Sequence, residues 1–171
     1  MPNWCNNIAY IKFPSQETYD SFIAAYEEKG SDFGLFSYFI PRPAFLENIS
    51  RLDSNHKEDW HLWSKENWST KWDAVLHDIL PAQLLRKEDG GLTIRAEFDT
   101  AWCPPDAFYT TLCERWGFDI EAYYVEYGMD YGGIWTKEED TFYDGLSERE
   151  YCDRLDSEFD VTATLDEFEA A

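Results

Sequence analysis

Residues 67 to 73 bring together side chains that are well suited to holding a ligand. The block consists, in order, of Asn67, Trp68, Ser69, Thr70, Lys71, Trp72 and Asp73. Indole faces stack on a ligand while a few polar groups fix its orientation, so a pocket lined in this way could bind a small molecule or a peptide. All of these residues except Ser69 are therefore candidate pocket residues.

A purely structural role explains the same block and is favoured by the residue types. Indole rings bury large areas, so Trp72 is expected inside an indole cluster. Lys71 can lie across a tryptophan face as a cation–π contact, and Asp73 can cap a helix that follows it. The ligand pocket and the structural turn remain alternatives at this stage.

Two further groups of candidates lie where strands are expected to end. Thr100 and Trp102 precede a helix whose N-terminus could attract an anion. Pro104 and Pro105 have no N–H groups, however, so Trp102 is interpreted as a core or hydrophobic-staple residue. Glu126 and Asp130 flank a glycine-bent aromatic loop, which is either a pocket mouth or a plain turn.

Other reactive side chains form no catalytic pattern, and no metal or cofactor is expected. His56, His61 and His77 have no histidine or cysteine partner three or four residues away. The cysteines lack the Cys-x-x-Cys spacing of zinc and redox sites, so free thiols are expected at Cys5, Cys103, Cys113 and Cys152. These patterns favour a binding protein over an enzyme.

Composition indicates one soluble, strongly acidic domain. The 171 residues include 14 Lys+Arg against 35 Asp+Glu, a formal net charge of −21, and 18% are aromatic. Such a charge repels nucleic acid and favours basic partners. No apolar segment is long enough to span a membrane and no secretory leader is recognisable, so the cytoplasm of a bacterial host is the expected location.

Hydrophobic spacing predicts an α+β fold of ferredoxin-like topology. A strand is expected at 7–13, a helix from Ser15 to Gly30, a buried strand at 35–40 and an aromatic-rich insertion at 44–80, with a short helix at 72–79. A hairpin of 83–87 and 92–98 then follows around a Glu-Asp-Gly-Gly turn. A second helix, with Phe108, Leu112 and Trp116 on its buried stripe, precedes a strand at 118–127. Two such β-α-β units form a split β-α-β antiparallel sheet with helices on one face.

The last part of the chain is expected to be an acidic extension. Residues 138–171 contain 13 acidic and 2 basic residues, a net charge of −11. A hairpin at 134–143 and a helix from a capping box at Ser147 to about Asp156 are predicted. The division is 1–137 as the ferredoxin-like domain and 138–171 as an extension packed on it but separable from its folding core.

Four blocks of this sequence resemble the YubB-like ferredoxin-fold family of enterobacterial plasmids and phages. They lie at 1–7, 67–73, 98–105 and 126–133. Ser69 stands where that family usually has glycine, and Cys103 where it usually has serine. The resemblance implies a ferredoxin-like fold and a mobile-element origin, but no activity, and it does not extend into the acidic segment.

Charge and origin together lead to a functional hypothesis. An acidic protein of a mobile element could occupy the basic surface of a host nucleic-acid-handling or defence protein, as a DNA-mimicking inhibitor would. The alternative is a small-molecule or peptide-binding domain that uses the 67–73 and 126–133 blocks. The acidic surface expected to meet a basic partner comprises Glu148, Glu150, Asp153, Asp156, Glu158 and Asp160.

Overall fold

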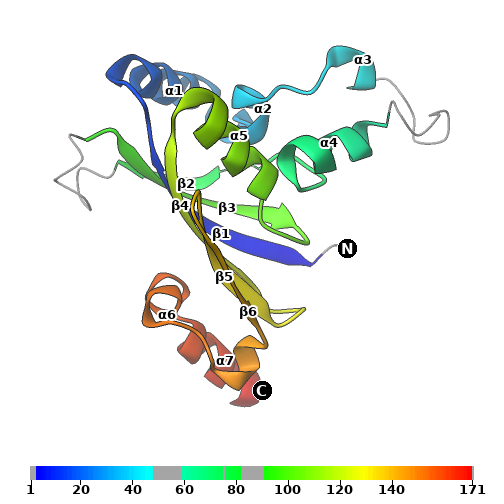
Figure 1. The fold of residues 1–171 in the computed structure, drawn as a ribbon, viewed down its shortest axis with the longest axis vertical. Coiled ribbons are helices and arrows are strands. Elements are labelled where there is room, and N and C mark those ends of the chain that lie inside the picture. The colour runs from blue at the N-terminus through cyan, green and yellow to red at the C-terminus, as the bar shows by residue number, and fades with distance from the viewer. Residues whose placement is uncertain (1–2, 48–58, 75, 82–90, 171) are drawn as a thin grey trace.

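A six-stranded antiparallel sheet organises the chain (Figure 1). The computed structural model describes residues 3–47, 59–74, 76–81 and 91–170. Within them the strand order is β2-β3-β1-β4-β5-β6. The strands are β1 (Trp4–Lys12), β2 (Leu76–Pro81), β3 (Thr93–Ala101), β4 (Asp119–Glu126), β5 (Tyr131–Thr136) and β6 (Asp140–Asp144).

The first four strands and two helices form the ferredoxin-like unit. Helix α1 (Gln16–Lys29) follows β1, and α5 (Asp106–Trp116) joins β3 to β4. The strand order β2-β3-β1-β4 is that of a split β-α-β fold, so the predicted α+β class is confirmed. Strands β5 and β6 extend the sheet beyond β4 as the predicted hairpin.

Local sequence explains where these two helices begin and end. The Ser15 hydroxyl accepts a hydrogen bond from the Thr18 N–H, and Gly30 ends α1 with a φ of 54°. Gly117 ends α5 in the left-handed region. Phe108 and Leu112 are buried as predicted, whereas Trp116 is exposed, which corrects its assignment to the buried stripe.

Each face of the sheet is covered by its own helices. Alternate residues of β4 point to opposite faces, so Tyr124 lies in the larger core while Tyr123 and Val125 lie in a second one. The larger core contains side chains of α1, α2 (Leu35–Phe39), α4 (Trp60–Trp68) and α5. The second core contains buried residues of α6 (Asp153–Phe159) and α7 (Val161–Ala170), which lie across the sheet from α1 and α5 (Figure 1).

The segment predicted as a strand at 35–40 is the short helix α2. A continuous apolar run resembles a buried strand, but the Asp73 carboxylate accepts hydrogen bonds from the N–H groups of Phe36 (2.8 Å) and Ser37 (3.1 Å). Gly34 makes this approach possible, since any Cβ there would collide with the Asp73 carboxylate. The helix is therefore stabilised by a residue far along the chain.

The second strand of the ferredoxin-like unit is β2, and the helix predicted at 72–79 is not present. Residues 76–81 pair with β3, from Leu76 opposite Phe98 to Pro81 opposite Ile94, and these backbone bonds prevail over the helical spacing. The strand predicted at 83–87 lies outside the described residues. Helices α2, α3 (Ala44–Glu47) and α4 thus all lie in the connection between α1 and β2.

The C-terminal segment differs from its prediction in detail. Residues 146–148 form a 3₁₀ turn, and the predicted capping-box helix begins only at Asp153, because Arg149 adopts a left-handed conformation with φ 61°. A further helix, α7, follows a left-handed Asp160. None of the helices in the described part of the chain has the length and apolar character needed to cross a bilayer.

Candidate functional site

Antiparallel pairing brings the four sequence blocks to one end of the sheet. Strand β1 begins where β3 ends, with Trp4 opposite Ala101, and β5 begins where β4 ends, with Tyr131 opposite Glu126. The start of β2 lies at the same end because β2 runs antiparallel to β3. Figure 1 shows this end of β1 and β3 beneath α4.

Thr70 anchors the 67–73 block to β3. Its buried hydroxyl donates a hydrogen bond to the Ala101 carbonyl and accepts one from the Ala101 N–H, both at 3.2 Å. The neighbouring Thr100 is also buried, and its hydroxyl donates to the Cys103 carbonyl (2.7 Å) and accepts from the Asn7 amide (2.9 Å). These bonds join the end of β3 to the 67–73 block and to β1.

Trp102 leaves the sheet in an unusual conformation and is exposed. Its φ is 75°, a left-handed value that costs free energy for a residue with a Cβ. The Trp102 N–H donates to the Asn3 carbonyl (3.1 Å), and the Tyr131 hydroxyl donates to the Trp102 carbonyl. The side chain is 49% exposed, so its assignment to the core is wrong. Hydrogen bonds with residues of two other blocks therefore hold the Trp102 backbone in the conformation that leaves its indole in solvent.

Trp72 forms an exposed pair with Trp4. The ring centroids are 6.0 Å apart, and the side chains are 38% and 49% exposed respectively. The expected cation–π contact is present, with Lys71 Nζ 4.4 Å from the Trp72 centroid. Trp72 therefore lies at the surface and not inside an indole cluster, which corrects the sequence interpretation. We call Trp4, Trp72 and Trp102 the indole surface.

A cavity of about 320 Å³ opens beside the indole surface. Among the described residues, the lysines that line it are Lys65 and Lys71, and none of the lining residues is a carboxylate. We call it the basic cavity. Its lining consists of His61, Lys65, Ser69, Thr70, Lys71, Ala101, Trp102 and Cys103.

Ser69 and Cys103 meet at the floor of the site. The Cys103 thiol donates to the Ser69 carbonyl (3.1 Å), and the Ser69 hydroxyl accepts from the Ala107 N–H (3.0 Å) in the first turn of α5. Burial, with a contribution from Asp106, raises the pKa of the Cys103 thiol. The thiol is therefore neutral at physiological pH and is unsuited to nucleophilic attack.

Of the ten pocket candidates, Thr70, Lys71 and Trp102 line the basic cavity and Trp72 lies beside it. Trp68 is buried, and its indole N–H donates to the Ile40 carbonyl (3.1 Å), so it is a core residue. Asn67 donates to the Trp63 carbonyl within α4. Asp73 caps α2, which precedes it in the chain, and not a helix that follows, as the sequence suggested.

Glu126 and Asp130 have mainly structural contacts. Glu126 is buried and accepts from the Gly128 N–H (2.8 Å) and the Asn3 amide (3.4 Å). Asp130 accepts from the N–H and the hydroxyl of Ser147, and it also borders a separate open groove of about 510 Å³ next to α7. Glu126 does not line that groove, so the two carboxylates do not form a common pocket mouth.

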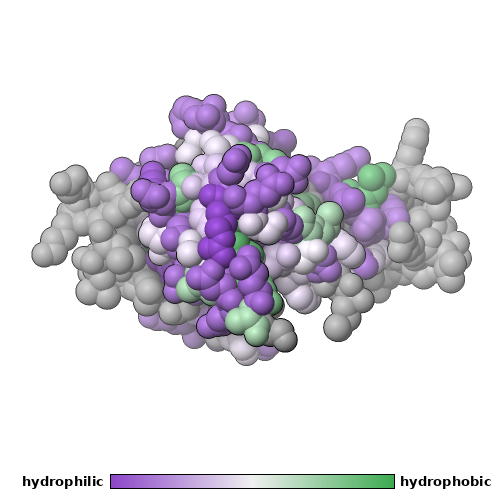
Figure 2. All heavy atoms as spheres, turned by 90° about the horizontal axis from the view of Figure 1, so that it is seen from below, coloured by the Kyte–Doolittle hydropathy of each residue, from purple (hydrophilic) through white to green (hydrophobic). Residues whose placement is uncertain are grey.

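The acidic candidates separate into exposed and bonded residues. Figure 2 views the molecule from the side that carries α6 and α7 and shows mostly hydrophilic residues there. Asp156 accepts from the Thr162 N–H (2.7 Å), and Glu158 accepts from the Tyr10 hydroxyl (2.8 Å) and pairs with Arg95. The exposed ones are Glu148, Glu150, Asp153 and Asp160.

Several residues of the site were missed from the sequence. His61, Lys65 and Ser69 follow one another at intervals of four, which is the spacing of one helix face, but the 44–80 segment had no clear helical pattern. Trp4 belongs to the first resembling block, and its type alone does not reveal its exposure. If residues 60–68 had been recognised as a helix, the four-residue spacing would have placed Lys65 on the same face as His61 and Ser69.

The fold and the site geometry define an α+β protein of ferredoxin-like topology with a ligand-sized cavity at one end of its sheet. A family model described as the ferredoxin-like domain in Api92-like protein matches residues 83–168, and the chain belongs to this family. The match includes the acidic segment, which the sequence resemblance had left outside. No curated protein and no solved structure matches the chain.

Proposed function

We propose that this protein binds a small ligand at the indole surface and the adjoining basic cavity. The observation that carries the proposal is that Trp102, half exposed, lines this cavity, and that the exposed Trp72–Trp4 pair adjoins it through Lys71. Trp102 keeps a left-handed backbone while its ring remains in solvent, an arrangement that folding alone does not favour. Exposed, rigid indoles offer stacking faces at low entropic cost.

Binding of fragments, followed through the tryptophan indole N–H resonances, tests this proposal. A library of ring-containing small molecules should include ligands that shift the signals of Trp4, Trp72 and Trp102 together. Trp102→Ala should remove the response, whereas Trp116→Ala, at an exposed tryptophan on α5 outside the cavity lining, should keep it. If no library member shifts these resonances, or if the shifts persist in Trp102→Ala, the proposal fails.

We propose as a second candidate that the acidic side of the molecule binds a basic host protein. Four exposed carboxylates near or on α6, named above, support this role, as does the net charge of −21. On this proposal the protein acts in the bacterial cytoplasm as a DNA-mimicking or anti-defence factor, with the mobile-element origin that the YubB-like resemblance implies. Direct contact with nucleic acid is disfavoured by the same charge.

Competition experiments separate the second candidate from the first. Added chain should displace DNA from a host nucleic-acid-binding protein at low salt and lose that effect at high salt. A variant carrying Glu148→Gln, Glu150→Gln, Asp153→Asn and Asp160→Asn should compete much less well, whereas Trp102→Ala should compete normally. Equal competition by both variants would contradict an acidic docking surface.

A further inference from the structure

The charges around the basic cavity contrast with those of the whole molecule. Acidic residues outnumber basic ones by 35 to 14 in the chain, yet the described residues that line this cavity include two lysines and no carboxylate. We infer that the ligand is a small anion that carries a planar ring and a phosphate or a carboxylate. This inference rests on the proposed function and adds the chemical class of the ligand.

Helix α4 and the turn after it position the cationic groups. His61, Lys65 and Ser69 lie one turn apart along the same face of α4, and Lys71 follows the left-handed turn at Ser69. Within the described residues neither Lys65 nor Lys71 forms an ion pair. Two ammonium groups that no described carboxylate pairs with are available to an anion.

The ring of the ligand has a defined place next to these cations. Trp102 lines the cavity together with both lysines, and its indole is half exposed. Lys71 packs on Trp72, which limits the freedom of its ammonium group, and the Trp72–Trp4 pair continues the aromatic surface. A ligand that stacks on an indole therefore keeps its anionic group within reach of Lys65 or Lys71.

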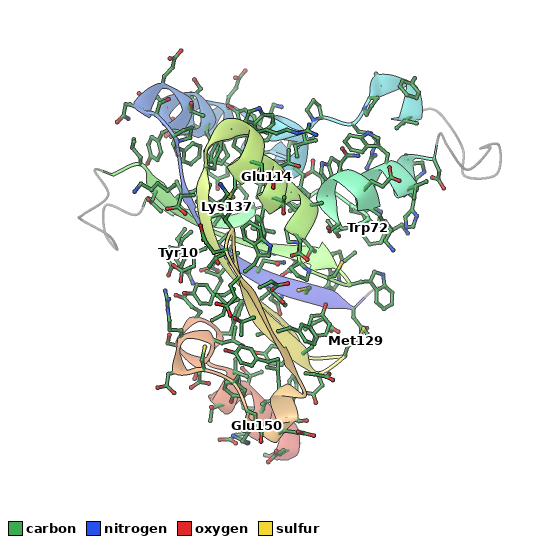
Figure 3. All side chains as sticks on the ribbon, viewed as in Figure 1. Tyr10, Trp72, Glu114, Met129, Lys137 and Glu150 are labelled. Carbon is green, nitrogen blue, oxygen red and sulfur yellow. The ribbon has the colours of Figure 1, made fainter. Side chains whose placement is uncertain are left out.

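The negative charge of the rest of the molecule does not prevent this binding. About half of the net charge lies in residues 138–171, and α6 and α7 lie across the sheet from α4 (Figure 1). Figure 3 shows Trp72 well separated from Glu150 of that segment. Because charges are screened over about 8 Å at physiological ionic strength, the acidic segment contributes little to the potential in the cavity.

Asp106 acts on Cys103, which lines the cavity, but does not itself line it. Its burial, with a further contribution from Asp140, raises its pKa to about 7. Near neutral pH a large fraction of Asp106 is therefore uncharged, which reduces its repulsion of an anion. The volume of about 320 Å³ suits a small molecule and not a folded partner.

Two matched ligand pairs test the inference by calorimetry and by tryptophan indole N–H shifts. AMP is compared with adenosine, and indole-3-acetate with indole-3-acetamide, so that each pair differs in the anionic group; inorganic phosphate is tested as an anion without a ring. At least one ring-bearing anion should bind about tenfold more tightly than its neutral counterpart and than phosphate. The pair that shows the preference distinguishes a phosphate from a carboxylate ligand.

Variants assign any preference to the two lysines. Lys65→Gln with Lys71→Gln should reduce the affinity for the anion about tenfold or more and leave the neutral ligand unchanged. Lys137→Gln also removes a lysine charge, but at an exposed site that does not line the cavity and that lies away from Trp72 in Figure 3. This control variant should therefore bind the anion like the parent. Denaturation midpoints equal to the parent's would verify that the variants are folded.

The outcomes separate the inference of an anionic ligand from the proposed binding of a small ligand. If neutral rings shift the indole resonances as strongly as their anionic counterparts, the inference of an anionic ligand is wrong while the binding function stands. The same conclusion follows if the double lysine variant binds the anion with the parent's affinity. If none of the ligands or fragments shifts the indole resonances, both the proposed binding of a small ligand and the inference of an anionic ligand are overturned.

Discussion

Ser69 supports two helices from one position. It ends α4 in a left-handed conformation with φ 63°, and its hydroxyl accepts a hydrogen bond from the Ala107 N–H in α5. A glycine at this position would adopt this φ without strain. The Cys103 thiol donates its hydrogen to the Ser69 carbonyl. Ser69 therefore contacts both α5 and the turn after β3.

Two substitutions at Ser69 should separate backbone strain from capping. Ser69→Ala keeps the strain and loses the acceptor, which should lower the free energy of unfolding by about 1 kcal/mol. Ser69→Gly loses the same acceptor but relieves a strain of about 1 kcal/mol, so it should remain close to the parent. Urea denaturation measures both variants, and equal destabilisation by alanine and glycine would contradict this account.

Asp106 should make stability depend on pH. It lies in the first turn of α5, where one of its carboxylate oxygens is buried and has no hydrogen-bond partner in the described part of the chain. Burial raises its folded-state pKa from 3.8 to about 7. The folded state thus binds a proton more tightly than the unfolded state, so stability falls as pH rises from about 4 to about 7.

Asp106→Asn should remove this contribution. The difference in unfolding free energy between Asp106→Asn and the parent should increase by about 2–4 kcal/mol in total between pH 4 and pH 7. Above pH 7 this difference should level off. Glu114→Gln, at an exposed position of the same helix, should show no comparable rise. Urea denaturation at several pH values provides the measurement, and parallel curves for Asp106→Asn and the parent would show that Asp106 ionises normally.

At the scale of elements, α2 illustrates how a distant residue selects a helix. The five residues Leu35–Phe39 are too few to form a stable helix alone. The Asp73 carboxylate satisfies the N–H groups of Phe36 and Ser37, and the Leu35 N–H donates to the Ala74 carbonyl (3.0 Å). Leu35 and Phe36 are then fully buried in the larger core.

Asp73→Ala should release this helix. The loss of a cap that serves two N–H groups should lower the free energy of unfolding by about 1–2 kcal/mol. Amide hydrogen exchange at Phe36 and Ser37 should accelerate in Asp73→Ala, whereas Asp73→Asn, which retains one oxygen acceptor, should be affected less. Unchanged exchange at both amides in Asp73→Ala would contradict the role of Asp73.

At the scale of the whole molecule, the acidic segment covers one face of the sheet. Leu146, Leu155 and Val161 are completely buried against Tyr123 and Val125 of β4. Strand β6 also pairs with β5 along the sheet edge. The segment therefore contributes both a core and a strand, although it carries about half of the net charge.

A chain truncated after Lys137 tests the sequence-based division at that residue. The three buried aliphatic side chains contribute about 1.5–3 kcal/mol each, which in sum is comparable with the stability of a whole domain. From this packing we expect the truncated chain to aggregate or to unfold without a cooperative transition. Removal of residues 169–171 alone should leave the transition unchanged. A cooperative transition at the parent's midpoint after the larger truncation would show that the segment is separable.

Local signals in the sequence determined much of the ferredoxin-like unit. The Ser15 cap and Gly30 mark the ends of α1, and Gly117 marks the end of α5. The alternation along β4 and the turn before β5 likewise act between residues close in the chain. These features were predictable because their causes lie within a few residues of their effects.

Only the tertiary structure decided α2, β2 and the candidate site. Helix α2 depends on Asp73, and β2 on its pairing with β3. Residue type alone predicts burial for an indole. Trp72 and Trp102 are nevertheless exposed, because the packing of the sheet and α4 leaves them uncovered. The cavity joins residues of α4 to the end of β3, and the hydrogen bonds of Thr70 with Ala101 and of Cys103 with Ser69 bring those parts of the chain together.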